Sequence, residues 1–189
     1  AGAAEAASGI ILVYSRAFQR GDYVNIGDTE GTVESIGILS TKIRTNKREL
    51  VSIPNSVLTS SVSKNYSSLV GDKGVILHTT VTIGYDTPWR QVHAMLLEAV
   101  GRVAELNREP KPFVYQTALS DFYVEYQLNA YMAEPSSRRR LLAELHAHIQ
   151  DVFNEHGVQI MSPNYEADPA APKLVPKSQW FAPPAKPGP

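Results

Sequence analysis

Apolar and polar residues alternate along several short stretches of this chain, the two-residue period of β-strands with one buried face. In the first third of the sequence the clearest run is residues 23–26, Tyr-Val-Asn-Ile. It lies between Gly21-Asp22 and Gly27-Asp28, and both pairs favour turns because glycine accepts a positive φ. The pattern predicts a short strand between two tight turns.

The alternation continues beyond this strand but changes phase. Over residues 32–45 the apolar positions switch parity near Gly37. This slip predicts one bent strand with bulges, of the kind that a small closed barrel needs. Residues 45–48 predict a hairpin loop, and the strand that follows ends at Pro54, whose nitrogen has no hydrogen to donate to a ladder.

Asn55 follows that proline and is expected to cap one helical turn. Residues 62–66 then predict a closing strand. Residues 18–67 therefore form, as we interpret them, a small β-barrel domain of the Sm-like or SH3-like kind. The polar, glycine-containing stretch 67–72 predicts a domain boundary.

The second half of the chain combines the two-residue period of strands with the three-to-four-residue spacing of helices. Residues 74–83 alternate and predict a half-buried strand. Thr87 is expected to cap a helix whose first residue is Pro88. The helix carries an apolar stripe at spacings of three and four: Trp89, Val92, Leu96, Ala99, Val103 and Leu106.

A hairpin and a second helix are expected next. Residues 113–119 and 122–130 alternate on either side of Ser120-Asp121, which predicts a β-hairpin. A helix is then predicted from Pro135 to a C-terminal cap at Gly157, followed by a last strand at 158–161. The order β-α-β-β-α-β is the split, ferredoxin-like arrangement, so residues 74–162 predict a ferredoxin-like domain and the whole chain is of the α+β class.

The two ends of the chain differ from the domains between them. Residues 1–17 are rich in alanine and predict a helix, in which Gly9 costs roughly 1 kcal/mol relative to alanine unless close packing compensates. Residues 163–189 contain many prolines and few apolar side chains. They predict an extended or partly disordered tail.

Composition narrows the possible functions. The formal net charge of −1, with 20% charged residues, does not favour nucleic-acid binding. The absence of cysteine excludes a disulfide framework and thiolate metal sites. No apolar run approaches the roughly 20 residues of a membrane-spanning helix, so no membrane-spanning helix is predicted within this sequence.

Candidate chemistry is sparse. The five histidines lack a third metal ligand at suitable spacing, no serine lies in a nucleophile elbow, and Gly27 and Gly31 lack the Lys-Ser/Thr of a phosphate loop. We therefore expect no enzyme activity, no catalytic residue, no metal and no cofactor. Arg138–Arg140 is interpreted as a solvated face, although it leaves an anionic partner open.

One alternative function comes from the predicted hairpin. RNA-recognition motifs share the β-α-β-β-α-β order and stack bases on aromatic residues of the sheet. Tyr123, Glu125, Gln127 and Tyr131 are predicted on the face opposite the apolar one. The basic, glycine-containing flanks of such motifs are absent. A soluble nucleic-acid or small-ligand binding module is the alternative hypothesis.

The barrel segment also carries a resemblance. Residues in register with a family signature are Arg16, Phe18, Gly21, Asp22, Val24, Gly27, Gly31, Val33, Ser40-Thr41, Arg44-Thr45, Ile53-Pro54-Asn55 and Asn65-Tyr66-Ser67. On these residues the chain resembles the small-conductance mechanosensitive channel (MscS) family over about fifty positions. The second half resembles that family in its element order and in Tyr85-Asp86 before the first helix.

The resemblance implies a function for each part of the chain. Residues 1–17 would be the end of the pore-lining helix, and the two domains would form a ring and a vestibule on the cytoplasmic side of the bacterial inner membrane. The partners would be six further copies in a homo-heptamer, the lipid bilayer through a preceding part, and the ions and small osmolytes that pass through on hypo-osmotic shock.

The resemblance also assigns roles to single residues. Gly9 is expected at a helix crossing, and Phe18 is expected to seat the helix on the barrel. Turns and caps are assigned to Gly21, Asp22, Gly27, Gly31, Pro54 and Asn55, and Arg16 and Asn65 belong to the same motif. The side portals are expected near the domain junction, at Ser68, Asp72 and Lys73.

Overall fold

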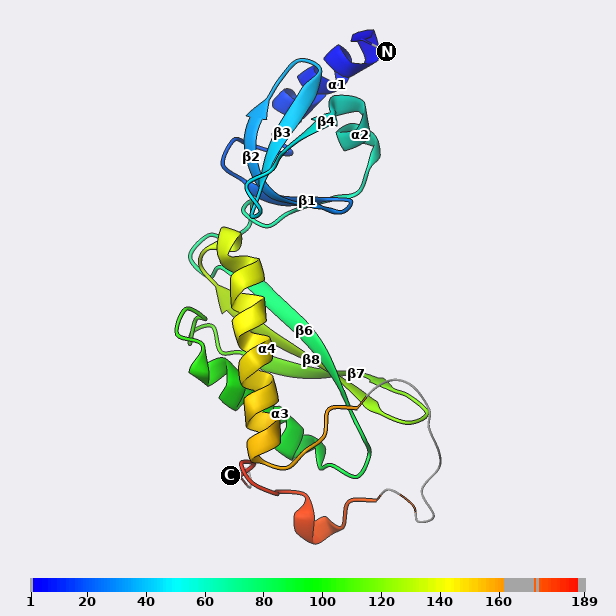
Figure 1. The fold of residues 1–189 in the computed structure, drawn as a ribbon, viewed down its shortest axis with the longest axis vertical. Helices are drawn as coiled ribbons and strands as arrows, with labels where there is room; N and C mark the ends of the chain where they lie inside the picture. The colour runs from blue at the N-terminus through cyan, green and yellow to red at the C-terminus, as the bar shows by residue number, and fades with distance from the viewer. Residues whose placement is uncertain (1, 162–171, 173, 187–189) are drawn as a thin grey trace. The chain divides into compact units, whose positions relative to one another are not determined.

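A computed structural model describes residues 2–161, 172 and 174–186 (Figure 1). It divides into two compact units, Ala1–Val75 with Glu134–Ser136, and Ile76–Ala133 with Ser137–Pro189. The described residues contain no helix that is both long and apolar enough to cross a bilayer. About half of the tail predicted at 163–189 lies outside the described residues.

The first unit is a curved antiparallel sheet accompanied by two helices. Its elements are α1 (Gly2–Ser15), β1 (Tyr23–Ile26), β2 (Thr29–Ile36), β3 (Ser40–Thr45), β4 (Leu50–Pro54), α2 (Asn55–Ser60) and β5 (Ser63–Asn65). The strand order is β4-β3-β2-β1-β5, so that each neighbouring pair except β1–β5 is a simple hairpin. Figure 1 shows the strong curl of this sheet.

One strand prediction is wrong in this unit. Residues 32–45 form two strands, β2 and β3, joined by a turn in which the N–H of Gly37 donates to the carbonyl of Ser40 at 2.9 Å. The turn contains two apolar residues that are not buried: Ile38 and Leu39 are 73% and 54% exposed. The bulge lies earlier, between Val33 and Ser35.

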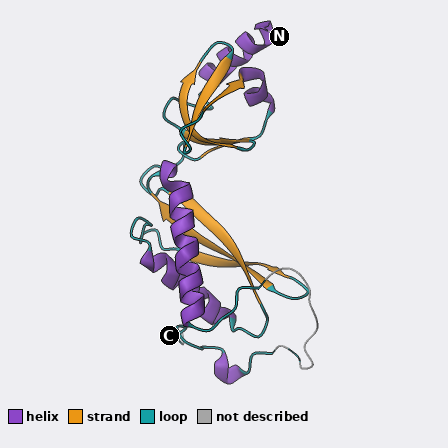
Figure 2. Ribbon diagram, in the orientation of Figure 1, coloured by secondary structure: helices purple, strands orange, loops and turns teal. Residues whose placement is uncertain are grey.

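The second unit is a sheet with both helices on one face. Its elements are β6 (Val75–Ile83), α3 (Trp89–Arg102), β7 (Phe113–Leu119), β8 (Val124–Met132), a short 3-10 turn η1 (Pro135–Ser137), α4 (Arg138–Glu155) and η2 (Lys177–Gln179). The strand order is β6-β8-β7. Figure 2 shows α3 and α4 covering the same side of this sheet.

The fourth strand of the predicted ferredoxin-like order is reduced to a single bridge. Ile160 pairs antiparallel with Ile83 at the free edge of β6, and the N–H of Met161 donates to the carbonyl of Thr82 at 2.8 Å. The edge position is the one that the ferredoxin-like order predicts, but residues 158–161 do not form a regular strand.

Two cap predictions are also wrong. Neither Asn55 nor Thr87 makes a side-chain capping bond at the start of the helix that follows it. Helix α3 begins at Trp89 and ends at Arg102, so the stripe residues Val103 and Leu106 are buried beyond its end. Gly157 does follow α4 in the left-handed region, with a φ of 65°.

Candidate functional site: the junction of the first helix with the barrel

Helix α1 packs closely at Gly9 against the β2–β3 turn and the start of α2. A Cβ atom at this position would lie 2.6 Å from the carbonyl oxygen of Ile38 and 2.7 Å from the Nδ2 of Asn55. Only a residue without a side chain allows so close an approach. The contact that Gly9 makes within the chain is therefore with the β2–β3 turn and the start of α2.

Asn55 is the polar centre of this junction. Its side chain is fully buried, and its Nδ2 donates to the carbonyls of Gly37 and Ile38 at 2.9 and 3.0 Å. Its Oδ1 accepts from the hydroxyl of Thr41 at 2.9 Å. The amide thereby satisfies the backbone of the turn against which Gly9 packs, and this use of the side chain explains why it does not cap α2.

Glu5 takes over the capping of α2. Its Oε2 accepts from the backbone N–H of Ser56 at 2.8 Å, and its Oε1 accepts from the hydroxyl of the same residue. Hydrogen bonds from Ser56 hold the pKa of the Glu5 carboxyl below its usual value. A carboxylate of one helix thus neutralises the exposed N–H groups of another.

Two apolar residues fix the end of α1 and the linker in the core. Leu12 and Phe18 are 3% and 5% exposed, and they belong to one buried cluster with Val24, Ile26, Val33, Ile43, Ile53 and Leu58. The phenyl ring of Phe18 is thus part of the barrel core. Burial of a side chain of this size contributes roughly 1.5–3 kcal/mol, enough to hold the linker in place.

The opposite side of α1 is apolar as well. Ile10, Ile11 and Val13 are 70%, 57% and 60% exposed. Nothing within the described part of this chain covers these side chains.

The motif glycines serve different purposes. Gly21 and Gly27 have φ values of 92° and 56°, which lie in the region that favours glycine. Gly31 instead allows two strands to approach, because a Cβ there would lie within van der Waals overlap of the Arg44 carbonyl. Pro54 is the last residue of β4 and pairs with Ser40.

Asn65 connects the chain that enters the barrel with the chain that leaves it. Its Nδ2 donates to the carbonyl of Ala17 at 3.1 Å and to the Oδ2 of Asp22 at 2.8 Å. Its Oδ1 accepts from the N–H groups of Ser67 and Ser68 at 3.0 and 3.2 Å. The residue after α1, Arg16, has a φ of 53°.

Sequence reasoning missed several functional contacts. No periodicity in the sequence relates Glu5 to Ser56. A second buried group was not foreseen: the Tyr23 hydroxyl donates to Glu30 Oε1 at 3.0 Å and accepts from Asn46 Nδ2 at 2.9 Å. These residues come together only through the pairing of β1 with β2 and of β2 with β3.

The remaining candidate residues lie apart from this junction. Asp72 and Lys73 are exposed in the turn between Gly71 and Gly74, and Ser68 is held by Asn65. Among the described residues no cluster of three or more histidine, aspartate or glutamate side chains could hold a metal ion.

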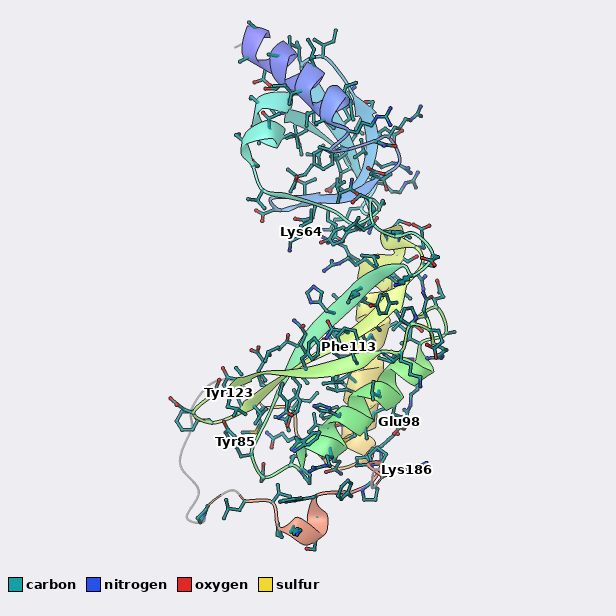
Figure 3. The ribbon with its side chains drawn as sticks, turned by 180° about the vertical axis from the view of Figure 1, so that it is seen from behind. Lys64, Tyr85, Glu98, Phe113, Tyr123 and Lys186 are labelled. Atoms are coloured by element: carbon teal, nitrogen blue, oxygen red, sulfur yellow. The ribbon has the colours of Figure 1, made fainter. Side chains whose placement is uncertain are left out.

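The aromatic surface of the hairpin differs from its prediction. Strand β8 begins at Val124, so Tyr123 lies in the hairpin loop rather than on the sheet (Figure 3). On the face opposite the helices, Phe113 and Tyr115 are in ring contact, with centroids 4.9 Å apart, and Thr117 donates to Glu125. The strand pair that carries these rings thus also carries a carboxylate, whereas an RNA-binding sheet would present cations.

Comparison with known proteins agrees with both units. Residues 3–68 match the family model "Mechanosensitive ion channel, beta-domain". Residues 77–160 match the model "Mechanosensitive ion channel MscS, C-terminal". The chain belongs to the MscS family of mechanosensitive channels and carries these two of its domains in succession.

Curated relatives share moderate identity with the chain. An uncharacterized MscS family protein of Synechocystis sp. is 29% identical over 160 residues, covering 85% of this chain and 53% of the relative. The mechanosensitive channel MscK of Escherichia coli is 31% identical over 133 residues, covering 70% of this chain and 12% of the relative. The chain therefore spans between about a tenth and about half of these relatives' lengths.

A solved structure has the same fold. Helicobacter pylori MscS in its closed state superposes with a TM-score of 0.67 at 20% identity, covering 89% of this chain and 65% of that one. At this identity the likeness establishes the fold.

Proposed function

We propose that this chain is the cytoplasmic portion of a tension-gated channel that releases ions and small osmolytes on hypo-osmotic shock. The observation that carries the proposal is the succession of the two MscS domains behind a helix whose Gly9, Leu12 and Glu5 are all engaged by the barrel. We assign no catalytic role to any residue.

Each part of the chain takes a role in this proposal. Residues 1–17 end the pore-lining helix, 18–67 form an assembly ring, 74–162 enclose a vestibule and 163–189 form the tail. The intact protein lies in the bacterial inner membrane. Bilayer tension favours the state with the larger in-plane area, so gating is a population shift that needs no ligand.

The proposed assembly is a homo-heptamer. Its support is the apolar stripe Ile10, Ile11 and Val13, which the described chain leaves uncovered and which a neighbouring copy of α1 would bury. Light scattering of the chain joined to its preceding membrane part should give seven times the 20.8 kDa mass contributed by this region, plus seven copies of the rest. A monomer under those conditions would contradict the assembly.

The portals are proposed at the junction residues Ser68, Asp72 and Lys73. Exchanging the two charges, D72K with K73E, should change ion preference in patch recordings and leave the opening tension unchanged. A change in opening tension with unaltered ion preference would contradict a portal at this junction.

Activity is tested with the gene that encodes this chain and whatever precedes it, expressed in a bacterial host without mechanosensitive channels of its own. We expect cells to survive a hypo-osmotic downshock that kills the empty-vector control, and membrane patches to show tension-activated currents. Expression in the membrane without either effect would overturn the proposal.

A further inference from the structure

The second unit contains a cavity that the channel function does not use. Its volume is about 450 Å³, within the range of about 300–1,000 Å³ found for small-molecule sites. It lies between the first turn of α3, the β7–β8 hairpin and the C-terminal segment, and its walls include Tyr85, Trp89, Leu119 and Trp180. Aromatic and aliphatic surfaces therefore dominate it.

One charged side chain lines this cavity. Arg90 is the only ionisable lysine, arginine, aspartate or glutamate among the described lining residues. Its guanidinium carbon lies 4.2 Å from the ring centre of Trp89, 5.5 Å from that of Trp180 and 4.9 Å from that of Phe181. No carboxylate among the described residues forms an ion pair with it. The aromatic rings stack on the faces of the guanidinium. Its N–H donors lie in the plane of the group, so stacking leaves them able to bind an anion.

A tyrosine lines the same cavity as this cation. Tyr126 lines the cavity with 1% of its surface exposed. Burial raises the pKa of Tyr126 to about 12, so the group stays a neutral donor at physiological pH. The neighbouring hydroxyl of Tyr85 is already bound, because it donates to the carbonyl of Ser120 at 2.6 Å.

The C-terminal segment closes one side. Leu174, Val175 and Trp180 contribute to the wall, and the segment is tied to α3 where Gln91 Nε2 donates to the carbonyl of Pro183 at 2.7 Å. The cavity exists because this segment lies on its own domain, so an occupant would stabilise that placement.

We propose that this cavity binds a small molecule with an apolar body and a single anionic group, with Arg90 and Tyr126 receiving the anion and the aromatic walls receiving the body. A half-buried arginine beside apolar walls favours a ligand that offers both a negative charge and an apolar surface. The inference concerns a ligand of this domain and does not depend on channel activity.

The test measures binding of matched probes to the whole chain by titration calorimetry and by the indole N–H signals of Trp89 and Trp180 in NMR spectra. Indole-3-acetate represents an aromatic anion and decanoate an aliphatic, lipid-derived one. Indole-3-acetamide and decanol are their uncharged counterparts. We expect at least one anion to bind about tenfold or more tightly than its uncharged counterpart. The preferred anion shows whether the ligand is aromatic or lipid-derived.

Variants separate charge recognition from folding. In Arg90→Gln the preference for the anion over its uncharged counterpart should disappear, in Arg90→Lys it should be partly kept, and in Tyr126→Phe it should fall about threefold to tenfold. Arg20→Gln, which changes an exposed arginine of the other unit, should leave it unchanged.

Three results would overturn the inference. They are no binding of any probe at millimolar concentration, equal affinity for charged and uncharged probes in the unaltered chain, and a preference that survives Arg90→Gln. Because binding is measured without a membrane, each of these results leaves the channel proposal standing, and a failed downshock test leaves the ligand site standing.

Discussion

Glu5 and Ser56 lie 51 positions apart in the chain and share two hydrogen bonds, one to the backbone N–H and one to the hydroxyl of the serine. The pair fastens α1 to the first turn of α2 and places a negative charge where the helix dipole favours one. It is the polar counterpart of the apolar contacts that Leu12 and Phe18 make with the core.

Glu5→Gln should lower the melting temperature at neutral pH and change its pH dependence. The folded state holds the pKa of Glu5 below that of the unfolded chain, so its stabilisation is present above the unfolded value of about 4.5 and is lost as the pH falls through the lower, folded value. Melting curves recorded from about pH 7 to pH 3 should therefore converge for the two proteins at the acid end.

The control for this comparison is Glu109→Gln, an exposed carboxylate in the other unit. It should leave the neutral melting temperature unchanged. Parallel curves for Glu5→Gln and the unaltered protein across the whole range would show that Ser56 does not stabilise the ionised carboxylate.

Gly9→Ala should destabilise the first unit by about 1–3 kcal/mol, the usual cost of forcing an added methyl group into a packed contact. The added Cβ would meet the rigid carbonyl of Ile38 and the amide of Asn55, so α1 must move away. Urea unfolding measures the loss, and protease cleavage within α1 should become faster.

Gly101→Ala is the matched control, since it lies near the end of another helix and its Cβ would have no atom within 4 Å. This change should be neutral or stabilise by up to about 1 kcal/mol through helix propensity. Equal effects of the two substitutions would mean that the close approach at Gly9 is not needed for stability.

Asn55→Asp should cost about 2–3 kcal/mol, because it replaces two N–H donors by an acceptor that faces two carbonyl oxygens in a buried site. Thr41→Val removes only the donor to Oδ1 and should cost about 1 kcal/mol. Chemical denaturation measures both, with the exposed Asn154→Asp as reference. A loss for Thr41→Val that exceeds the loss for Asn55→Asp would contradict this assignment of the donors.

His93 should make the second unit less stable in weak acid. Its Nε2 is buried without a partner in the described chain, its ring contacts Trp89 and Tyr126 edge-on, and burial lowers its pKa. The unfolded state therefore binds the proton more readily, so stability is full above the ordinary pKa of about 6.5 and falls below it.

Replacement by phenylalanine tests the effect of His93. His93→Phe keeps an aromatic ring and should flatten the stability profile between about pH 6.5 and pH 5, as measured by thermal unfolding. Identical slopes for the two proteins would exclude His93 as the cause. An NMR titration of its ring reports the same pKa directly.

Local pattern was sufficient for much of the fold. Alternation located β1, β6 and the β7–β8 hairpin, and the spacing of apolar residues located α3 and α4. The pattern failed between β2 and β3, where Ile38 and Leu39 occupy an exposed turn and imitate a continuing strand. Burial depends on the partner strands, which the alternation of a single segment does not contain.

The junction was less accessible to sequence reasoning. Asn55 has the residue type of a helix cap, but its amide instead donates to the backbone of a turn seventeen residues earlier in the chain. Glu5 then supplies the missing cap from a distant helix. Both outcomes depend on tertiary contacts. Residue preference near a helix start therefore predicted the wrong role for Asn55 and no capping role for Glu5.

Asn65 has a mechanical consequence. Its amide nitrogen binds the segment that follows α1. Its amide oxygen binds the two serines from which the chain continues to the second unit. A pull on the end of the helix can thus reach the departing segment through this one side chain, which belongs to the last residue of β5.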